Sequence, residues 1–293
     1  MKKAYIKDED GGWLRLGGTD GFSVFRTFDC GQCFRFDPAM NPTFENEVEG
    51  VAMGKYVRFA DSGEGDLMIK TSASDFENIW RDYLDTDTDY SAADKVIENA
   101  VGGLGGEHMR RAAEASRGIH ILRQEKWETL CSFIISQNNN IPRIKGILER
   151  LCMLLGEPIA ANGETLYAFP TAERLAACTL ETLQPLRAGF RAKYLLDAAR
   201  RVSSGEIDLE AVRRMPLCDA RAALQTILGV GPKVADCALL YGLHRTECFP
   251  MDVWMKRAMT LLPGVTPEAL GDAAGIAQQY IFHYARLHPE LFG

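Results

Sequence analysis

The sequence has no run of eighteen apolar residues, which is about the length that a helix needs to cross a membrane. Residues 1–7 lead into acidic residues and contain no apolar stretch of a secretory signal. No internal repeat or low-complexity tract is evident either. We therefore expect a soluble intracellular protein that does not bind membranes. Its 293 residues, 46% of them hydrophobic, are enough for two or three closely packed subdomains.

Cysteine pairs at metal-binding spacing are also lacking. Eight cysteines are scattered along the chain, and only Cys30 and Cys33 lie close together. Because no second pair stands at the spacing of a metal site, we expect no bound metal. The cysteines should be reduced and mostly buried.

Positive charge is scarce in the chain as a whole, whose formal net charge is −7. This balance argues at first sight against a nucleic-acid ligand, because neutralisation of phosphates supplies much of the nonspecific affinity. The distribution is uneven, however. Residues 1–105 hold 11 Lys and Arg against 20 Asp and Glu, whereas residues 186–260 hold 12 against 8. The second segment is therefore the better candidate for contact with a polyanion.

The apolar pattern changes its period near residue 70. Before it, short apolar runs alternate with Gly, Asp, Asn and Pro, which is typical of antiparallel strands. From Ser74 onward the spacing is helical, and the glycine-rich run at residues 102–106 predicts a flexible break. The fold class is α+β and mainly α, with an N-terminal antiparallel β lobe and leading helix over residues 1–110 and a helical domain over residues 111–293. Strands are expected at residues 22–28, 33–36, 51–59 and 67–69, and helices include residues 127–135, 144–155, 175–186 and 194–202.

A glycine hairpin joins two short helical patterns, one from Asp219 to about Ile227 and one over residues 232–242. Gly229 and Gly231 bracket a single apolar residue, so the backbone can turn through positive φ and lie close to a ligand. Free amides in such a turn can face a phosphate oxygen. Pro232 suits the first position of the second helix. Together these features predict a helix-hairpin-helix.

Two side chains near the hairpin have the chemistry of a nucleophile and its partner. Lys233 lies in the first helical turn, where the helix dipole and burial should lower its pKa, and only an uncharged lysine is a nucleophile. Asp252, nineteen residues later, precedes the amphipathic run 253–259 and should cap a helix. Alone, Asp252 could be only a cap and Lys233 only a phosphate contact. Dinucleotide binding is disfavoured, because the third glycine of that motif is missing and Val234 follows the lysine.

The run GVGPKVADCALL followed by FPMDVWMKRAM resembles the signature of the helix-hairpin-helix (HhH-GPD) DNA glycosylases. Residues 132–144, SFIISQNNNIPRI, resemble the triple-asparagine segment of the 8-oxoguanine DNA glycosylase/AP lyases, and the similarity extends from Gly31 to Phe282. This resemblance implies a base excision repair enzyme for damaged double-stranded DNA. It would excise 8-oxoguanine opposite cytosine and then cleave the strand at the abasic site. Its active site would lie in the cleft between the β lobe and the helical lobes.

In the reaction that the resemblance implies, Lys233 forms a Schiff base with the sugar and Asp252 stabilises the positive charge that develops there. No cofactor is required, although the carbonyls of such hairpins can hold a structural cation. The related endonuclease III branch carries an iron–sulfur cluster, but no cysteine follows Cys248 here, so we expect no cluster. We also expect a cytoplasmic monomer, associated with the nucleoid in a prokaryote.

The resemblance assigns four residues to the base pocket. Gly31 would offer its carbonyl to the N7 hydrogen that 8-oxoguanine has and guanine lacks. Cys237 and Phe282 would sandwich the base, and Gln278 would meet its Watson–Crick edge. Core packing is an alternative explanation for Cys237 and Phe282, and exposure on a helix is an alternative for Gln278.

The resemblance also assigns the contacts with DNA. Asn138 would fill the gap left by the everted base, and Phe190 would wedge into the opposite strand. Arg143 and Arg191 would read the estranged cytosine, for which the planar guanidinium fork is suited. The hairpin glycines Gly229 and Gly231 would approach a phosphate. An asparagine-rich run could equally form a turn or a cap.

Two other functions remain open. The first is a helix-hairpin-helix glycosylase for a different lesion, such as an alkylated purine or an adenine mispair, although monofunctional relatives lack the lysine at position 233. The second is a noncatalytic helix-hairpin-helix module that only grips the DNA backbone. The second predicts no need for Asp252.

Overall fold

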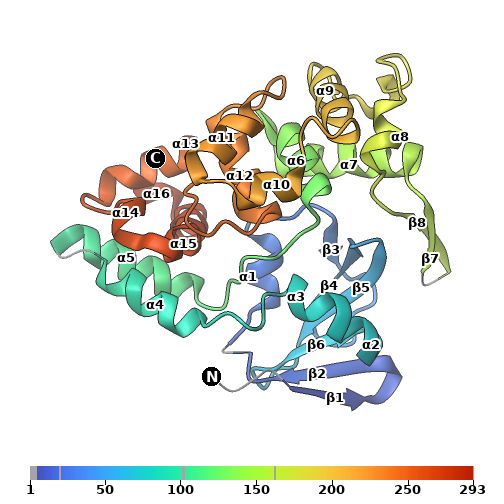
Figure 1. Cartoon of the computed structure of the whole chain (residues 1–293). Helices are drawn as coiled ribbons and strands as arrows, with labels where there is room; N and C mark the ends of the chain where they lie inside the picture. The colour runs from blue at the N-terminus through green and yellow to red at the C-terminus, as the bar shows by residue number, and fades with distance from the viewer. Residues whose placement is uncertain (1–4, 20, 101–102, 162, 293) are drawn as a thin grey trace.

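The computed structural model describes residues 5–19, 21–100, 103–161 and 163–292. A six-stranded antiparallel sheet occupies one end of the molecule and helices form the rest (Figure 1). The strand order is β1-β2-β6-β5-β4-β3. The chain forms the β1-β2 hairpin at one edge, passes to the other edge at β3, and returns through β4 and β5 to β6, which pairs with β2. The strands are β1 (Tyr5–Glu9), β2 (Trp13–Gly17), β3 (Phe36–Pro38), β4 (Glu45–Ala52), β5 (Lys55–Asp61) and β6 (Leu67–Lys70).

Aromatic rings fill the space between the sheet and the helices that cover it. Phe59 of β5 stacks on Phe28 with ring centroids 5.0 Å apart, and meets Trp80 edge-on at 5.7 Å. All three side chains are buried, and each such burial stabilises the fold by about 2–3 kcal/mol. The covering elements are α1 (Val24–Asp29), α2 (Ala73–Asp75), the π-helical turn η2 (Phe76–Trp80) and α3 (Arg81–Tyr83).

The strand expected at residues 22–28 is wrong, because this segment forms helix α1. Ser23 caps the helix by accepting a hydrogen bond from the Arg26 amide. Val24, Thr27 and Phe28 are buried at the spacing of one helical face. The segment has β-branched and aromatic residues that are typical of a strand. Packing against the sheet stabilises the helical conformation instead.

The other expected strands are only partly correct. The run 51–59 divides at a turn around Met53 and Gly54 into the hairpin of β4 and β5. Residues 33–36 are mostly turn, with β3 beginning at Phe36. The strand over residues 67–69 is confirmed as β6, whereas β1 and β2 were not expected.

The remaining helices form the lobes that carry the hairpin (Figure 1). Their buried side chains make one continuous core. The helices expected over 127–135, 144–155 and 194–202 are confirmed. Short elements are η1 (Asp10–Gly12), η3 (Gln184–Leu186), η4 (Met259–Leu261), η5 (Gly271–Ala273) and the hairpin of β7 (Pro158–Ala161) with β8 (Glu164–Tyr167). The helices are α4 (Tyr90–Asn99), α5 (Gly103–Ser116), α6 (Lys126–Ser136), α7 (Ile141–Leu155), α8 (Ala172–Ala176), α9 (Arg191–Ser203), α10 (Leu209–Arg214), α11 (Leu217–Gln225), α12 (Pro232–Gly242), α13 (Val253–Ala258), α14 (Pro267–Leu270), α15 (Ala274–Leu287) and α16 (Pro289–Phe292).

Two sequence expectations fail in these lobes. The helix expected over 175–186 is absent, because α8 ends at Ala176 and turns lead to η3. The flexible break expected at 102–106 is wrong for residues 103–106, which begin helix α5, while residue 102 lies outside the described residues. A Cβ on Gly105 would lie 2.7 Å from the carbonyl oxygen of Pro263. Glycine therefore allows a close backbone approach at this position.

The first and last parts of the chain are interleaved. Helix α5 packs against α4 on one side and against α15 on the other (Figure 1). The boundary expected between residues 110 and 111 thus falls inside α5. Residues 90–116 complete the core around the C-terminal helix.

All eight cysteines are free thiols, and seven of them are buried while Cys218 is exposed. The expectation of reduced, mostly buried thiols is therefore confirmed. Within the described ranges, no helix is both long and apolar enough to span a bilayer.

Candidate active site

The hairpin between α11 and α12 forms as the sequence predicts. Gly229 has φ of +78°, a conformation that favours glycine, and a Cβ there would overlap the ring of Tyr194. Gly231 is different, because its φ is −92° and its backbone is extended as the N-cap of α12. A Cβ on Gly231 would meet no atom within 4 Å. Only Gly229 therefore needs positive φ, and Gly231 faces open space.

Two side chains of helix α9 contact the hairpin. The Leu228 amide donates a hydrogen bond to Oδ2 of Asp197 at 2.7 Å, and the same carboxylate pairs with Arg201. The Tyr194 ring, also on α9, fills the space under Gly229. The loop that would face a phosphate is thus held by a carboxylate on one side and an aromatic ring on the other.

Lys233 is the second residue of α12 and is half-buried. Its Nζ atom lies 5.1 Å from the ring centroid of Phe133, a buried residue of α6. An aromatic face at this distance attracts the ammonium form, and it also leaves one side of the amine in an apolar environment. One side of the amine therefore faces the Phe133 ring, while the lysine as a whole is half-buried.

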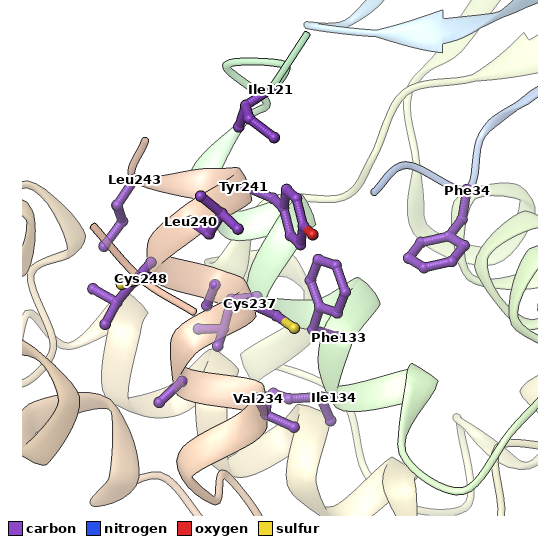
Figure 2. Close-up of a cluster of buried hydrophobic side chains, with 14 of the residues drawn as sticks. Phe34, Ile121, Phe133, Ile134, Val234, Cys237, Leu240, Tyr241, Leu243 and Cys248 are labelled. Carbon is purple, nitrogen blue, oxygen red and sulfur yellow. The ribbon is translucent and has the colours of Figure 1, made fainter. Parts of the chain in front are cut away.

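Cys237 lies one helical turn beyond Lys233, and its sulfur points toward Phe133 (Figure 2). Burial raises the pKa of the Cys237 thiol to about 11. The charge of Lys233 and a hydrogen bond with it act against this increase, whereas the charge of Asp252 adds to it. Amine, thiol and carboxylate therefore interact electrostatically within one site.

Asp252 is the N-cap of α13, as the sequence predicts. Its Oδ1 atom accepts a hydrogen bond from the Met255 amide at 2.8 Å, which fixes the carboxylate at the start of the helix. Asp252 therefore caps α13, and its charge also reaches the Cys237 thiol on α12.

Gly31, in the segment between α1 and β3, has φ of +79°. A Cβ on Gly31 would be 3.5 Å from Cε1 of Phe282 on α15, so the two residues expected in the base pocket are neighbours. Phe282 is half-buried, which leaves part of its ring accessible.

Gln278 is buried and not exposed on its helix. Its Oε1 atom lies 3.1 Å from the hydroxyl of Tyr241, one turn beyond Cys237 on α12. Burial raises the pKa of the Tyr241 phenol well above its usual range, with smaller contributions from Cys237, Cys30 and Asp252. Tyr241 therefore connects the lysine helix with the two segments expected to surround the base.

The three asparagines after α6 have three different structural roles. Asn138 is exposed with φ of +46°. The side chain of Asn139 donates to the Ile135 carbonyl at 3.0 Å, and Asn140 caps α7 by accepting from the Arg143 amide at 3.0 Å. The cap interpretation is thus correct for Asn140, while Asn138 projects from the loop.

Arg191 holds this loop in place. Its guanidinium donates to the carbonyls of Gln137 and Asn138, the latter at 2.8 Å, and lies 4.4 Å from the Phe190 ring. Burial and the nearby charge of Arg143 lower the pKa of Arg191. Arg191 is only 2% exposed, whereas Phe190 is 48% exposed. The four residues expected to contact DNA at the everted base and the opposite strand therefore lie together.

Two further residues of this site, Phe133 and Tyr241, had no functional role predicted from the sequence. Phe133 lies under the lysine and stacks on Tyr241 with ring centroids 5.3 Å apart. The spacing of 233, 237 and 241 along one helical face is a signal that could have identified Tyr241.

The described part of the chain contains no group of three or more His, Cys, Asp or Glu side chains that could hold a metal. A cation at the hairpin carbonyls stays a prediction.

Comparison with known proteins gives matches over most of the chain. Residues 18–130 match the N-terminal domain of 8-oxoguanine DNA glycosylase, and residues 131–273 match the HhH-GPD superfamily of base excision DNA repair proteins. A probable N-glycosylase/DNA lyase of Methanothermobacter thermautotrophicus is 33% identical over 221 residues, which are 65% of this chain and 70% of the relative. An N-glycosylase/DNA lyase of Saccharomyces cerevisiae is 40% identical over 153 residues, which are 48% of this chain but only 41% of the relative.

The fold also matches a solved structure along its whole length. This is the Clostridium acetobutylicum 8-oxoguanine glycosylase/lyase in complex with double-stranded DNA containing cytosine opposite 8-oxoG. The TM-score is 0.89 at 34% identity, and the match covers 99% of this chain and all of the other.

Proposed function

This chain belongs to the 8-oxoguanine DNA glycosylases of the HhH-GPD superfamily, and we propose that it excises 8-oxoguanine opposite cytosine from duplex DNA and then cleaves the strand as an AP lyase. The observation that carries the proposal is the placement of Lys233. Its amine lies over Phe133, interacts with Cys237, and opens a helix whose hairpin has amides available for a phosphate. A module that only grips DNA has no use for an amine in this position.

The first step is eversion of the damaged nucleotide, because stacking shields its glycosidic bond inside the duplex. Eversion costs roughly a few kcal/mol. Asn138, exposed at the end of α6, fills the gap, and Phe190 wedges into the opposite strand. Arg143 and Arg191 then contact the cytosine left without its partner. Gly229 and Gly231 bring hairpin amides to a phosphate near the everted nucleotide.

In the pocket, the carbonyl of Gly31 accepts a hydrogen bond from the N7 hydrogen of 8-oxoguanine. Guanine has a lone pair at N7, so it would oppose the same carbonyl, and the mismatch costs about 1–3 kcal/mol. Cys237 and Phe282 contact the two faces of the base, and Gln278 meets its Watson–Crick edge.

Base excision then uses the neutral amine of Lys233. The amine attacks C1′, the bond from C1′ to the base breaks, and the base leaves with the electron pair and gains a proton. Asp252 stabilises the positive charge that develops on the sugar. Opening of the sugar ring, with a proton passing to its oxygen, gives an imine between Lys233 and C1′.

The imine makes the hydrogens at C2′ acidic. Loss of one of them allows the bond from C3′ to its phosphate oxygen to break, and the phosphate leaves. Water then hydrolyses the imine and releases Lys233. These steps require no metal and no redox cofactor.

Borohydride trapping tests the proposal, because borohydride reduces the imine to a stable covalent adduct. We expect the adduct with an 8-oxoguanine:cytosine duplex for the wild-type protein and none for Lys233→Gln. Lys193→Gln is the matched control, because Lys193 also lies over an aromatic ring, 5.4 Å from the centroid of Tyr194. It should still form the adduct. An adduct with Lys233→Gln would show that the nucleophile is a different residue.

A panel of duplexes separates this specificity from the other lesions considered above. The protein should act on 8-oxoguanine:cytosine in preference to alkylated purines and adenine mispairs. Strand nicking before and after hot alkali distinguishes base excision alone from excision followed by cleavage.

We also propose that the protein acts as a cytoplasmic monomer, associated with the nucleoid in a prokaryote. The eight free thiols support a reducing compartment. Light scattering of the protein alone and on a short duplex tests the monomer, and a particle of twice the expected mass would contradict it.

A further inference from the structure

The segment around Gly31 is held on both sides of the glycine. Nε2 of Gln279 donates to the Cys30 carbonyl at 2.8 Å, and Nε2 of Gln124 donates to the Gln32 carbonyl at 2.7 Å. Among the residues that the structure describes, none donates to the carbonyl of Gly31 itself. Two backbone carbonyls are therefore fixed, and the one between them is left for a ligand.

The side chain of Gln32 strengthens the hold on the downstream side. It donates to the carbonyls of Thr27 and His120 at 3.0 and 2.8 Å, and it accepts from the Leu122 amide at 2.9 Å. The upstream side depends on Gln279 for the Cys30 carbonyl. Gln279 is thus the contact through which α15 sets the position of Gly31.

Tyr241 fixes the orientation of the Gln279 amide. A carbonyl oxygen can only accept, so the amide nitrogen must face Cys30 and the amide oxygen must face the opposite way. There, Oε1 accepts from the Tyr241 hydroxyl at 2.6 Å. Gln279 is 1% exposed and Tyr241 is 4% exposed, so water does not compete for these bonds.

Tyr241 connects this contact with the nucleophile. Its ring stacks on Phe133 with an interplanar angle of 18° (Figure 2). Phe133 in turn lies under the Lys233 amine. An uninterrupted set of contacts therefore runs from Lys233 through Phe133 and Tyr241 to Gln279 and then to the Cys30 carbonyl.

We propose that Gln279 and Tyr241 are positioning residues that set the Gly31 carbonyl relative to the lysine helix and thereby make excision depend on the N7 hydrogen of the base. This inference rests on the proposed function. Glycine at positive φ has few steric restraints of its own, so its carbonyl direction depends on its neighbours. A hydrogen bond discriminates between bases only when donor and acceptor are aligned.

Base excision and strand cleavage should respond differently to loss of this positioning contact. Base excision needs the Gly31 carbonyl in position, whereas cleavage at a preformed abasic site needs Lys233 and no base in the pocket. Loss of the positioning contact should therefore slow the first reaction and spare the second. A residue that only stabilised the fold would affect both reactions together.

Gln279→Leu tests this division, because leucine keeps the apolar bulk and removes both hydrogen bonds. Single-turnover excision of 8-oxoguanine should fall by about tenfold or more, since one aligned bond and its buried partner are lost. Cleavage of an abasic duplex should stay within about twofold of wild type. The ratio of 8-oxoguanine to guanine excision should also fall.

Tyr241→Phe is the second variant, and it keeps the stacking on Phe133. Gln279 retains its bond to Cys30 but loses the group that orients it, so excision should fall by a smaller factor, roughly threefold. Tyr280→Phe is the matched control, and it lies on α15 next to Gln279. Its hydroxyl donates to Oδ1 of Asp94 at 2.9 Å, far from the Cys30 contact in the chain. Both activities should be retained.

The outcomes separate the two proposals. If Gln279→Leu excises 8-oxoguanine as fast as wild type, or loses abasic-site cleavage to the same extent as excision, the positioning role is wrong and the proposed function stands. If wild type leaves 8-oxoguanine in place, the proposed function fails and the positioning role fails with it.

Discussion

The site has two halves that are built in opposite ways. The nucleophile half consists of Lys233, Cys237 and Asp252, which lie within nineteen residues on two consecutive helices. The reading half consists of Gly31 and the residues of α15 beside it. In this half, the hydrogen bond from Gln279 to the Cys30 carbonyl joins residues 249 positions apart. Local helix signals therefore create the nucleophile half, whereas buried side-chain hydrogen bonds between distant segments create the reading half. The first is visible as a local sequence pattern, whereas the hydrogen bonds that hold the second are visible only in the fold.

The strongest test of the nucleophile half is Asp252→Asn. Asparagine is also a good N-cap, so the bond to the Met255 amide and the stability of α13 should be kept. Loss of the negative charge should lower base excision by about 100-fold or more. Single-turnover excision and urea unfolding measure the two effects separately.

Asp208→Asn is the control for this substitution, because Asp208 caps α10 in the same manner and lies outside the site. It should change neither activity nor stability. If Asp252→Asn also left both unchanged, the carboxylate would be only a cap and the noncatalytic module would regain support.

The hairpin offers a matched pair of substitutions. Gly229→Ala forces alanine to φ of +78° against the Tyr194 ring, so it should lower the free energy of unfolding by about 2–4 kcal/mol. Gly231→Ala places a methyl group in open space at an ordinary φ and should be neutral for stability. Because Gly231 faces the proposed phosphate, it should instead weaken DNA binding. Equal destabilisation by both substitutions would contradict the assignment of the turn.

The reading half should respond to acid through His283 on α15. Burial lowers the pKa of His283 to about 4, and its Nδ1 atom lies 3.0 Å from Oγ of Ser116. The folded-state pKa is below the unfolded value of about 6.5, so burial of the neutral imidazole contributes stability that is present above pH 6.5. This contribution is lost as the pH falls toward 4, because the unfolded chain binds the proton more readily. From pH 7 to pH 5 the loss should be about 2 kcal/mol.

The measurement compares urea unfolding of wild type and His283→Gln at the two pH values. The variant should lack this contribution, so the difference in stability between the two proteins should narrow as the pH falls. A constant difference would mean that His283 titrates alike in the folded and unfolded chains. His288→Gln is the control, since His288 is more exposed.

The elements predicted correctly carry their own boundary signals. Pro232 starts α12 and Gly242 ends it, while Asp252 caps α13, and each of these signals acts within a few residues. The strand expected at 22–28 failed because its residues suit both states and tertiary packing decided for α1. The glycine run at 103–106 failed because the need for a close approach to Pro263 comes from a distant segment.

The same distinction applies within the site. The sequence pattern and the family resemblance located Lys233, Asp252 and Gly31, which lie inside recognisable motifs. Neither assigned a role to Tyr241 or Gln279, because a hydrogen bond between buried side chains on separate helices has no local signal in the sequence. The burial of Gln278 goes against the alternative of an exposed helical residue and agrees with its expected place beside the pocket.

The interleaving of α5 with α15 has a consequence for biosynthesis. A domain normally begins to fold while the ribosome is still extending it, starting from the N-terminal side. Here the β lobe and Gly31 emerge early, yet the residue that fixes the Cys30 carbonyl is translated 249 positions later. The lysine helix is complete before that residue exists. A chain that stops before α15 would therefore include both Gly31 and Lys233 but lack the side chain that holds the Cys30 carbonyl.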